Sequence, residues 1–169
     1  MHQIFTDAAT NPGRRTPGRA GSGQRMRYTD LSQFLAGARL PGPVALIFAE
    51  DGVEVDSTLR HHRHLGFASL VMLGPDRVPL AADVAPVVHR VRFDPVPRGA
   101  VAEAVTRIAA RHPDQWLYWG YNAEYLFFPF CETRSVGEML AFHAEERRDA
   151  MLSYVVDLYA GDLAAAPGG

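Results

Sequence analysis

The sequence contains no lysine, and all 17 of its basic residues are arginine. Without lysine the chain has no side-chain amine for Schiff-base catalysis or for a lysine-dependent phosphate loop. A single cysteine, Cys131, excludes an intrachain disulfide and any metal site built from several thiolates. No apolar run reaches the roughly 18–20 residues that cross a bilayer, and the N-terminus lacks the apolar core of a signal peptide. We therefore expect a cytoplasmic protein without an integral membrane segment.

Charge is unevenly distributed along the chain. Five arginines lie between Arg14 and Arg27 with no acidic residue among them, although the whole chain has a net charge of -2. The remainder is therefore acidic, which argues against a nucleic-acid partner, since such surfaces are normally basic. Residues 10–24 are rich in Gly, Pro, Ser and Arg, so the sequence predicts a disordered tail over residues 1–25. Met26, which follows directly, is a candidate for the true first residue of the chain.

The chain of 169 residues, 47% of them apolar, is long enough for one sizeable core. We expect a single α/β domain over residues 26–163 and a frayed C-terminus over 164–169. Apolar or alternating runs predict strands at residues 44–48, 69–73, 87–93, 116–119 and 151–159. Helical patterns predict helices that begin near Asp30 and at residues 55–64, 99–111 and 135–148, with Gly66 ending the second. This order predicts a mostly parallel sheet flanked by helices.

Ligands of such sheets bind beyond the carboxyl ends of the strands, which directs attention to residues 49–52 and 120–125. Glu50 and Asp51 follow the first strand, and their carboxylates could accept hydrogen bonds from a ribose or a base edge. Asn122 and Glu124 follow the fourth strand and could orient a sugar or a nucleotide. Solvated polar turns explain the same residues equally simply, with the acids placed near a helix start where negative charge is favoured.

Aromatic residues surround the predicted turn at residues 120–125, and histidines lie at the end of the helix predicted at 55–64. The aromatic rings either stack on a ligand or form a core, and for residues 127–130 we expect burial in the core. The histidines are interpreted as imidazoles at a helix C-terminus, where positive charge is stabilised, rather than as zinc ligands. The aromatic residues are Trp116, Tyr118, Trp119, Tyr121, Tyr125, Phe127, Phe128 and Phe130, and the histidines are His61, His62 and His64.

The order of these segments resembles the family-2-like glycosyltransferases of the GT-A type. The N-terminal part of that family's sequences is similar to three segments of this chain: residues 44–52, the His-Arg-His-Leu-Gly-Phe segment at 62–67, and the strand predicted at 69–73. Asn122-Ala123-Glu124-Tyr125-Leu126 resembles the family's Asp-x-Asp-Glu-Phe-Leu segment, and residues 134–136 with the following helix resemble what comes after it. The resemblance covers roughly residues 43–163.

The resemblance implies the nucleotide-sugar-binding half of a GT-A (Rossmann-like) fold, truncated at the C-terminus. It implies a nucleotide-sugar site that includes Glu50, Asp51, Asn122 and Glu124, and transfer of a sugar to an acceptor, as in a hexosyltransferase. It also implies a divalent Mn²⁺ or Mg²⁺ that bridges the diphosphate, with Glu124 as the candidate metal ligand.

Two departures from the family pattern leave alternatives open. Tyr121 and Ala123 occupy the aspartate positions when the segment is read without a gap, and Asn122 replaces one aspartate when a deletion is allowed. The chain also ends where the family's acceptor region and catalytic base normally follow. The alternatives are a non-catalytic relative that binds a nucleotide, a sugar or a protein partner, and a fragment of a longer enzyme.

Overall fold

The computed structural model describes residues 2–6, 26–158, 161–162 and 164–165. The described residues form one sheet in the spatial order β2-β5-β4-β3-β6-β1-β7. The strands from β2 to β6 in this order run parallel, as the sequence predicts, while β1 is antiparallel to both of its neighbours. The strands are β1 (His2–Thr6), β2 (Arg27–Tyr28), β3 (Val44–Phe48), β4 (Ser69–Gly74), β5 (Val88–Arg92), β6 (Leu117–Tyr121) and β7 (Ala150–Tyr154).

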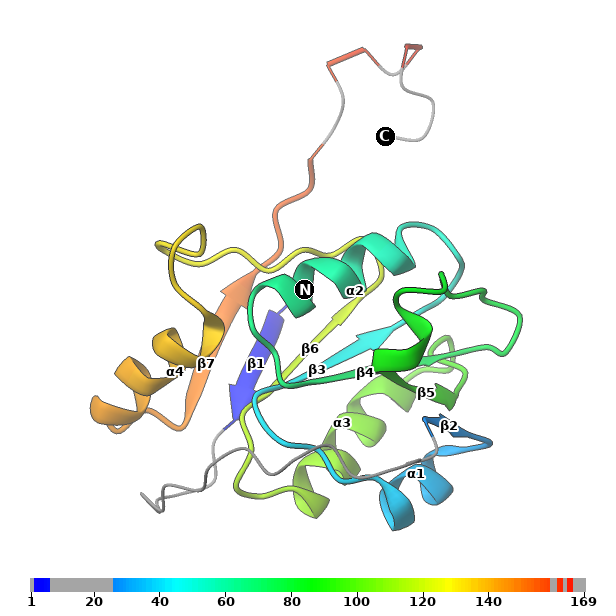
Figure 1. Cartoon of the computed structure of the whole chain (residues 1–169), viewed down its shortest axis with the longest axis horizontal. Helices are drawn as coiled ribbons and strands as arrows, with labels where there is room; N and C mark the ends of the chain where they lie inside the picture. The colour runs from blue at the N-terminus through cyan, green and yellow to red at the C-terminus, as the bar shows by residue number, and fades with distance from the viewer. Residues whose placement is uncertain (1, 7–25, 159–160, 163, 166–169) are drawn as a thin grey trace.

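Helices cover the sheet on both faces (Figure 1). Helices α2 (Val55–His64) and α4 (Val136–Glu145) pack on one face, and α1 (Leu31–Gly37) and α3 (Ala100–Arg111) pack on the other. A short 3-10 turn, η1 (Ala85–Val87), precedes β5. Each face therefore has its own apolar core, which is the arrangement expected of a parallel sheet.

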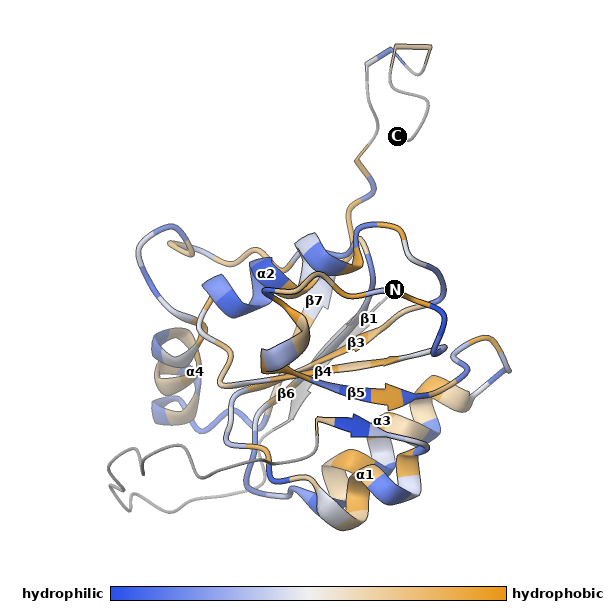
Figure 2. Ribbon diagram, turned by 45° about the vertical axis from the view of Figure 1, so that its right-hand side comes forward, coloured by the Kyte–Doolittle hydropathy of each residue, from blue (hydrophilic) through white to orange (hydrophobic). Residues whose placement is uncertain are grey.

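Strand β3 lies in the middle of the sheet and is fully buried. Its side chains alternate between the two cores: Ala45 and Ile47 pack with α2, and Val44, Leu46 and Phe48 pack with α3. A continuous apolar run is required here because both faces of the strand are covered. Figure 2 shows the apolar residues of β3 and β4 at the centre of the molecule.

Helix α2 ends as the sequence predicts. Gly66 follows the helix with a φ of 94°, a conformation that glycine adopts without steric cost. The turn brings the chain back to β4, so α2 crosses from the carboxyl end of β3 to the amino end of its parallel neighbour. At the start of α1, the Asp30 carboxylate accepts a hydrogen bond from the Gln33 N–H at 2.8 Å, which confirms the predicted helix start.

Strand β1 differs from the sequence prediction of a tail over residues 1–25. The segment His2–Thr6 pairs with β7 from His2↔Tyr154 to Thr6↔Ala150 and meets β6 at Thr6↔Leu117. Its partners lie more than a hundred residues away along the chain, and local composition carries no signal for such pairing. Residues 7–25, where the rest of the tail is predicted, lie outside the described residues.

Candidate functional site

Two loops meet at the carboxyl ends of β3 and β6. The Glu50 N–H donates a hydrogen bond to Asn122 Oδ1 at 3.1 Å. The Asn122 Nδ2 atom donates to Asp51 Oδ1 at 2.7 Å and to the Val53 carbonyl at 2.9 Å. The expectation that the two predicted turns lie together is therefore confirmed. The Asn122 side chain joins them, together with the Asn122 N–H, which donates to the Phe48 carbonyl at 3.0 Å.

Glu124 and Asp51 also hold the backbone of these loops. The Tyr121 N–H donates to Glu124 Oε2 at 2.8 Å, which closes the turn around Ala123, a residue with a φ of 64°. The Ala123 N–H in turn donates to Thr58 Oγ1 on α2 at 2.9 Å. Asp51 Oδ1 accepts from the Val53 N–H at 2.9 Å. The hydrogen bonds of Asp51, Asn122 and Glu124 thus fix the shape of this edge.

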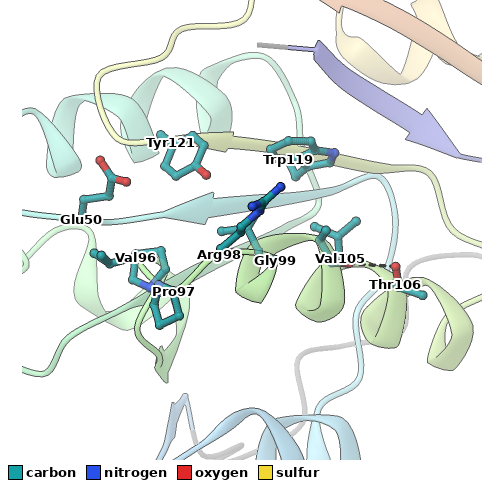
Figure 3. A pocket seen from close by; sticks show the side chains of 12 residues that line it. Glu50, Val96, Pro97, Arg98, Gly99, Val105, Thr106, Trp119 and Tyr121 are labelled. Atoms are coloured by element: carbon teal, nitrogen blue, oxygen red, sulfur yellow. Dashed lines mark hydrogen bonds between the residues drawn. The ribbon is translucent and has the colours of Figure 1, made fainter.

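Glu50 differs from the other three predicted site residues. Its backbone N–H is tied to Asn122, but its exposed carboxylate has no hydrogen bond or ion pair with any other described residue. The side chain stands at the edge of a pocket, next to Tyr121 (Figure 3). Of the four predicted residues, Glu50 is therefore the one whose side chain forms no hydrogen bond with another described residue.

The pocket beside Glu50 has a volume of about 490 Å³ and lies between β6 and α3. Its walls are the half-buried rings of Trp119 and Tyr121, the apolar side of α3 and the loop of residues 95–99. Glu50 and Arg98 are the charged residues that line it, and Figure 3 shows them on either side of the Tyr121 ring. An aromatic wall between one carboxylate and one guanidinium suits a planar ligand with hydrogen-bond donors at one end and an anion at the other.

A second, more polar compartment of about 860 Å³ opens on the other side of Glu50. The two compartments share Glu50, Pro95 and Val96, so they meet at the end of β3. Both carboxylates and guanidinium groups line the second compartment, and one pair, Arg92 Nε and Asp76 Oδ2, lies 3.8 Å apart. The charged residues of this compartment besides Glu50 are Asp30, Asp76, Asp94, Arg77 and Arg92.

The Tyr121 hydroxyl keeps its proton at neutral pH. Burial raises the pKa of Tyr121 above its usual value, and the negative charges of Glu50 and Glu124 raise it further. The hydroxyl can therefore donate a hydrogen bond to a ligand in the pocket. Figure 3 shows the Tyr121 hydroxyl on the far side of its ring from the Glu50 carboxylate, toward Arg98.

The residues at this edge do not fit the divalent metal site that the family resemblance implies. Tyr121 and Ala123 offer no carboxylate, and both polar atoms of the Asn122 side chain are engaged with the neighbouring loop. Glu124 is the one carboxylate of the segment, and its Oε2 atom accepts the Tyr121 N–H. Within the part of the chain that the structure describes, no three His, Cys, Asp or Glu residues are grouped so that they could hold a metal ion.

Two of the three histidines at the end of α2, His61 and His62, contact backbone carbonyls. His61 Nε2 lies 2.7 Å from the Leu126 carbonyl, and His62 Nδ1 lies 2.8 Å from the Thr58 carbonyl. His62 is fully buried against the ring of Tyr118, and burial lowers its pKa to about 4. The interpretation as charged imidazoles at a helix end is therefore wrong for His62, because α2 presents this ring to the core.

The aromatic residues near β6 divide into three groups. Tyr118 and Phe128 are buried in the core, and Trp119 and Tyr121 line the pocket. Phe127 and Phe130 are 70% and 69% exposed, so the expectation of burial is wrong for these two. The loop of residues 95–99, including Arg98, was not among the predicted site residues. The prolines at positions 95 and 97, which break the chain between β5 and α3, are the sequence signal that could have drawn attention to it.

Comparison with known proteins finds no matching family model, no similar curated protein and no similar solved structure. No helix in the described part of the chain has the length and apolar character that crossing a membrane requires.

Proposed function

We propose that this chain is a glycosyltransferase-like protein of the GT-A type, and that the pocket beside Glu50 binds the nucleotide part of a nucleotide-sugar donor. The observation that carries the proposal is the pocket itself. It lies at the carboxyl ends of parallel strands, its wall is aromatic, and its charged residues are one carboxylate and one guanidinium. Ligands of open α/β sheets bind at this edge.

Each side chain has a distinct role in this proposal. The rings of Trp119 and Tyr121 contact the face of the base, because aromatic side chains bury planar apolar surface well. The Glu50 carboxylate accepts hydrogen bonds from N–H groups of the base or from ribose hydroxyls. Arg98 contacts a phosphate oxygen. Asn122 contacts no ligand, and it positions Glu50 by holding the Glu50 backbone N–H.

The alternative is a non-catalytic relative that binds a nucleotide or sugar, or a protein partner. The observation that favours it is the use of Asn122 and Glu124, the polar residues of the catalytic segment implied by the resemblance, as hydrogen-bond partners of backbone groups. Sugar transfer also requires a base that removes the proton of the acceptor. The catalytic proposal and the nucleotide- or sugar-binding alternative share the pocket and differ only in turnover.

Calorimetric titration with UDP-sugars and GDP-sugars tests the shared proposal. We expect one of them to bind, and we expect Glu50→Gln to weaken binding about 10-fold or more, because a charged hydrogen-bond acceptor is lost. Glu132→Gln is the matched control, since Glu132 is exposed and lines neither compartment. Absence of binding by every nucleotide sugar would contradict both ligand-based proposals and leave the protein-partner role.

Release of UDP or GDP from the bound donor then separates the enzyme from the binding protein. Slow hydrolysis of the sugar–phosphate bond, reduced in Glu50→Gln when the donor is below saturation, supports the transferase. Binding without any release supports the non-catalytic relative.

A further inference from the structure

The guanidinium group of Arg98 gives the pocket a positive charge. Arg98 is exposed at the start of α3 and has no hydrogen bond or ion pair with any other described residue. Figure 3 shows its guanidinium extending toward the β6 wall, near Trp119. An arginine that forms no internal contact and reaches across a pocket is available to an anionic ligand.

The carboxylates at the same edge are not grouped into a metal site within the described residues. An aspartate pair is replaced by Tyr121 and Ala123, and the Asn122 amide is held by Asp51, Val53 and the Glu50 N–H. Among the described residues no three His, Cys, Asp or Glu side chains are grouped so that they could supply the several oxygen ligands that Mg²⁺ or Mn²⁺ requires. The charge of a diphosphate therefore has to be balanced by another group of this chain.

We infer that nucleotide binding in this pocket needs no divalent metal and that Arg98 supplies the positive charge that binds the phosphate. This inference rests on the proposed function and names the way in which the same site holds its ligand. A guanidinium presents two parallel N–H donors to two phosphate oxygens, and such bidentate contacts are among the strongest hydrogen bonds in proteins. Glu50 is the other charged residue of the pocket, so loss of Arg98 leaves the site with a negative charge that repels the phosphate.

Calorimetric titration with UDP and GDP, first in EDTA and then in MnCl₂, tests the metal requirement. We expect the dissociation constant of the nucleotide that binds to differ less than about threefold between the two conditions. Binding that appears only with Mn²⁺, or that tightens about 10-fold or more with it, would overturn the inference and leave the proposed function standing. Absence of binding in both conditions would overturn the inference together with the proposed function.

Three substitutions test the role of Arg98 in the same EDTA buffer. Arg98→Ala is expected to weaken nucleotide binding about 10- to 100-fold, the effect of losing a charge-assisted hydrogen bond to phosphate. Arg98→Lys should recover part of the affinity through its charge but not the bidentate geometry. The control is Arg39→Ala, since Arg39 is exposed and lines neither compartment. Unchanged affinity in Arg98→Ala, with a circular dichroism spectrum like that of the wild type, would overturn the assignment of Arg98.

Discussion

Removal of the Asn122 side chain should loosen the two loops that form the site. Asn122→Ala removes three hydrogen bonds, one from the Glu50 N–H and two to Asp51 and the Val53 carbonyl. Each hydrogen bond contributes about 1 kcal/mol net to the free energy of unfolding. Because Asn122 is only half-buried, water can replace part of these bonds, and we therefore expect the free energy of unfolding to fall by about 2 kcal/mol. In a chain of this length that corresponds to a fall in Tm of about 4–8 °C.

Urea unfolding followed by circular dichroism measures this loss directly. Glu132→Ala is the control, because it truncates an exposed side chain outside the two loops, and it should change the free energy of unfolding by less than about 0.5 kcal/mol. A similarly small change in Asn122→Ala would refute the conclusion that this side chain joins the loops.

Asn122→Asp provides a stricter test of the same contact. The substitution keeps the shape of the side chain but replaces the Nδ2 donor with an oxygen that faces the Asp51 carboxylate and the Val53 carbonyl. We expect it to destabilise the protein at neutral pH at least as much as Asn122→Ala, since it adds like-charge repulsion to the lost hydrogen bonds. A variant as stable as the wild type would contradict the hydrogen-bond assignment of the amide.

Three further predictions concern the fold around the site. Burial lowers the pKa of His62 from 6.5 to about 4, so the native state favours the neutral ring. The free energy of unfolding is therefore highest above pH 6.5 and falls as the pH decreases from about 6.5 to about 4. The loss is on the order of 3 kcal/mol, and chemical unfolding at several pH values should show it in the wild type but not in His62→Leu. Gly66→Ala should lower the free energy of unfolding by about 1 kcal/mol or more, because its φ is 94° and a Cβ would lie 3.2 Å from Ser135 Cβ. Ser135→Ala should cost about 1 kcal/mol in the same assay, because it removes the Ser135 Oγ that accepts the Glu138 N–H at the start of α4, and an unchanged value would argue against that cap.

The central part of the fold follows from local sequence. The apolar run of β3 predicts a strand covered on both faces, and Gly66 marks the end of α2, because few residues other than glycine adopt a positive φ. The meeting of the two loops follows from parallel topology, since the carboxyl ends of neighbouring parallel strands lie at one edge. These predictions succeed because each depends on one element or on the geometry of adjacent strands.

Other features depend on contacts that no local pattern describes. Strand β1 is defined by pairing with β6 and β7, far away in sequence. That Asn122 and Glu124 bind a ligand stays a prediction. Both side chains hydrogen bond to backbone groups, and residue type alone could not distinguish such a side chain from one that faces a pocket. Arg98 stands in the pocket because the loop before α3 folds toward β6, which is a property of tertiary packing.

Fluorescence of Trp119 tests the central claim, that the pocket between β6 and α3 binds a nucleotide, most directly. The chain has two tryptophans, so Trp116→Phe leaves Trp119 in the pocket wall as the one emitter. We predict a saturable change in its emission during titration with UDP or GDP in EDTA, and loss of that change in Arg98→Ala. Unchanged Trp119 emission with both nucleotides up to about 1 mM would contradict the account.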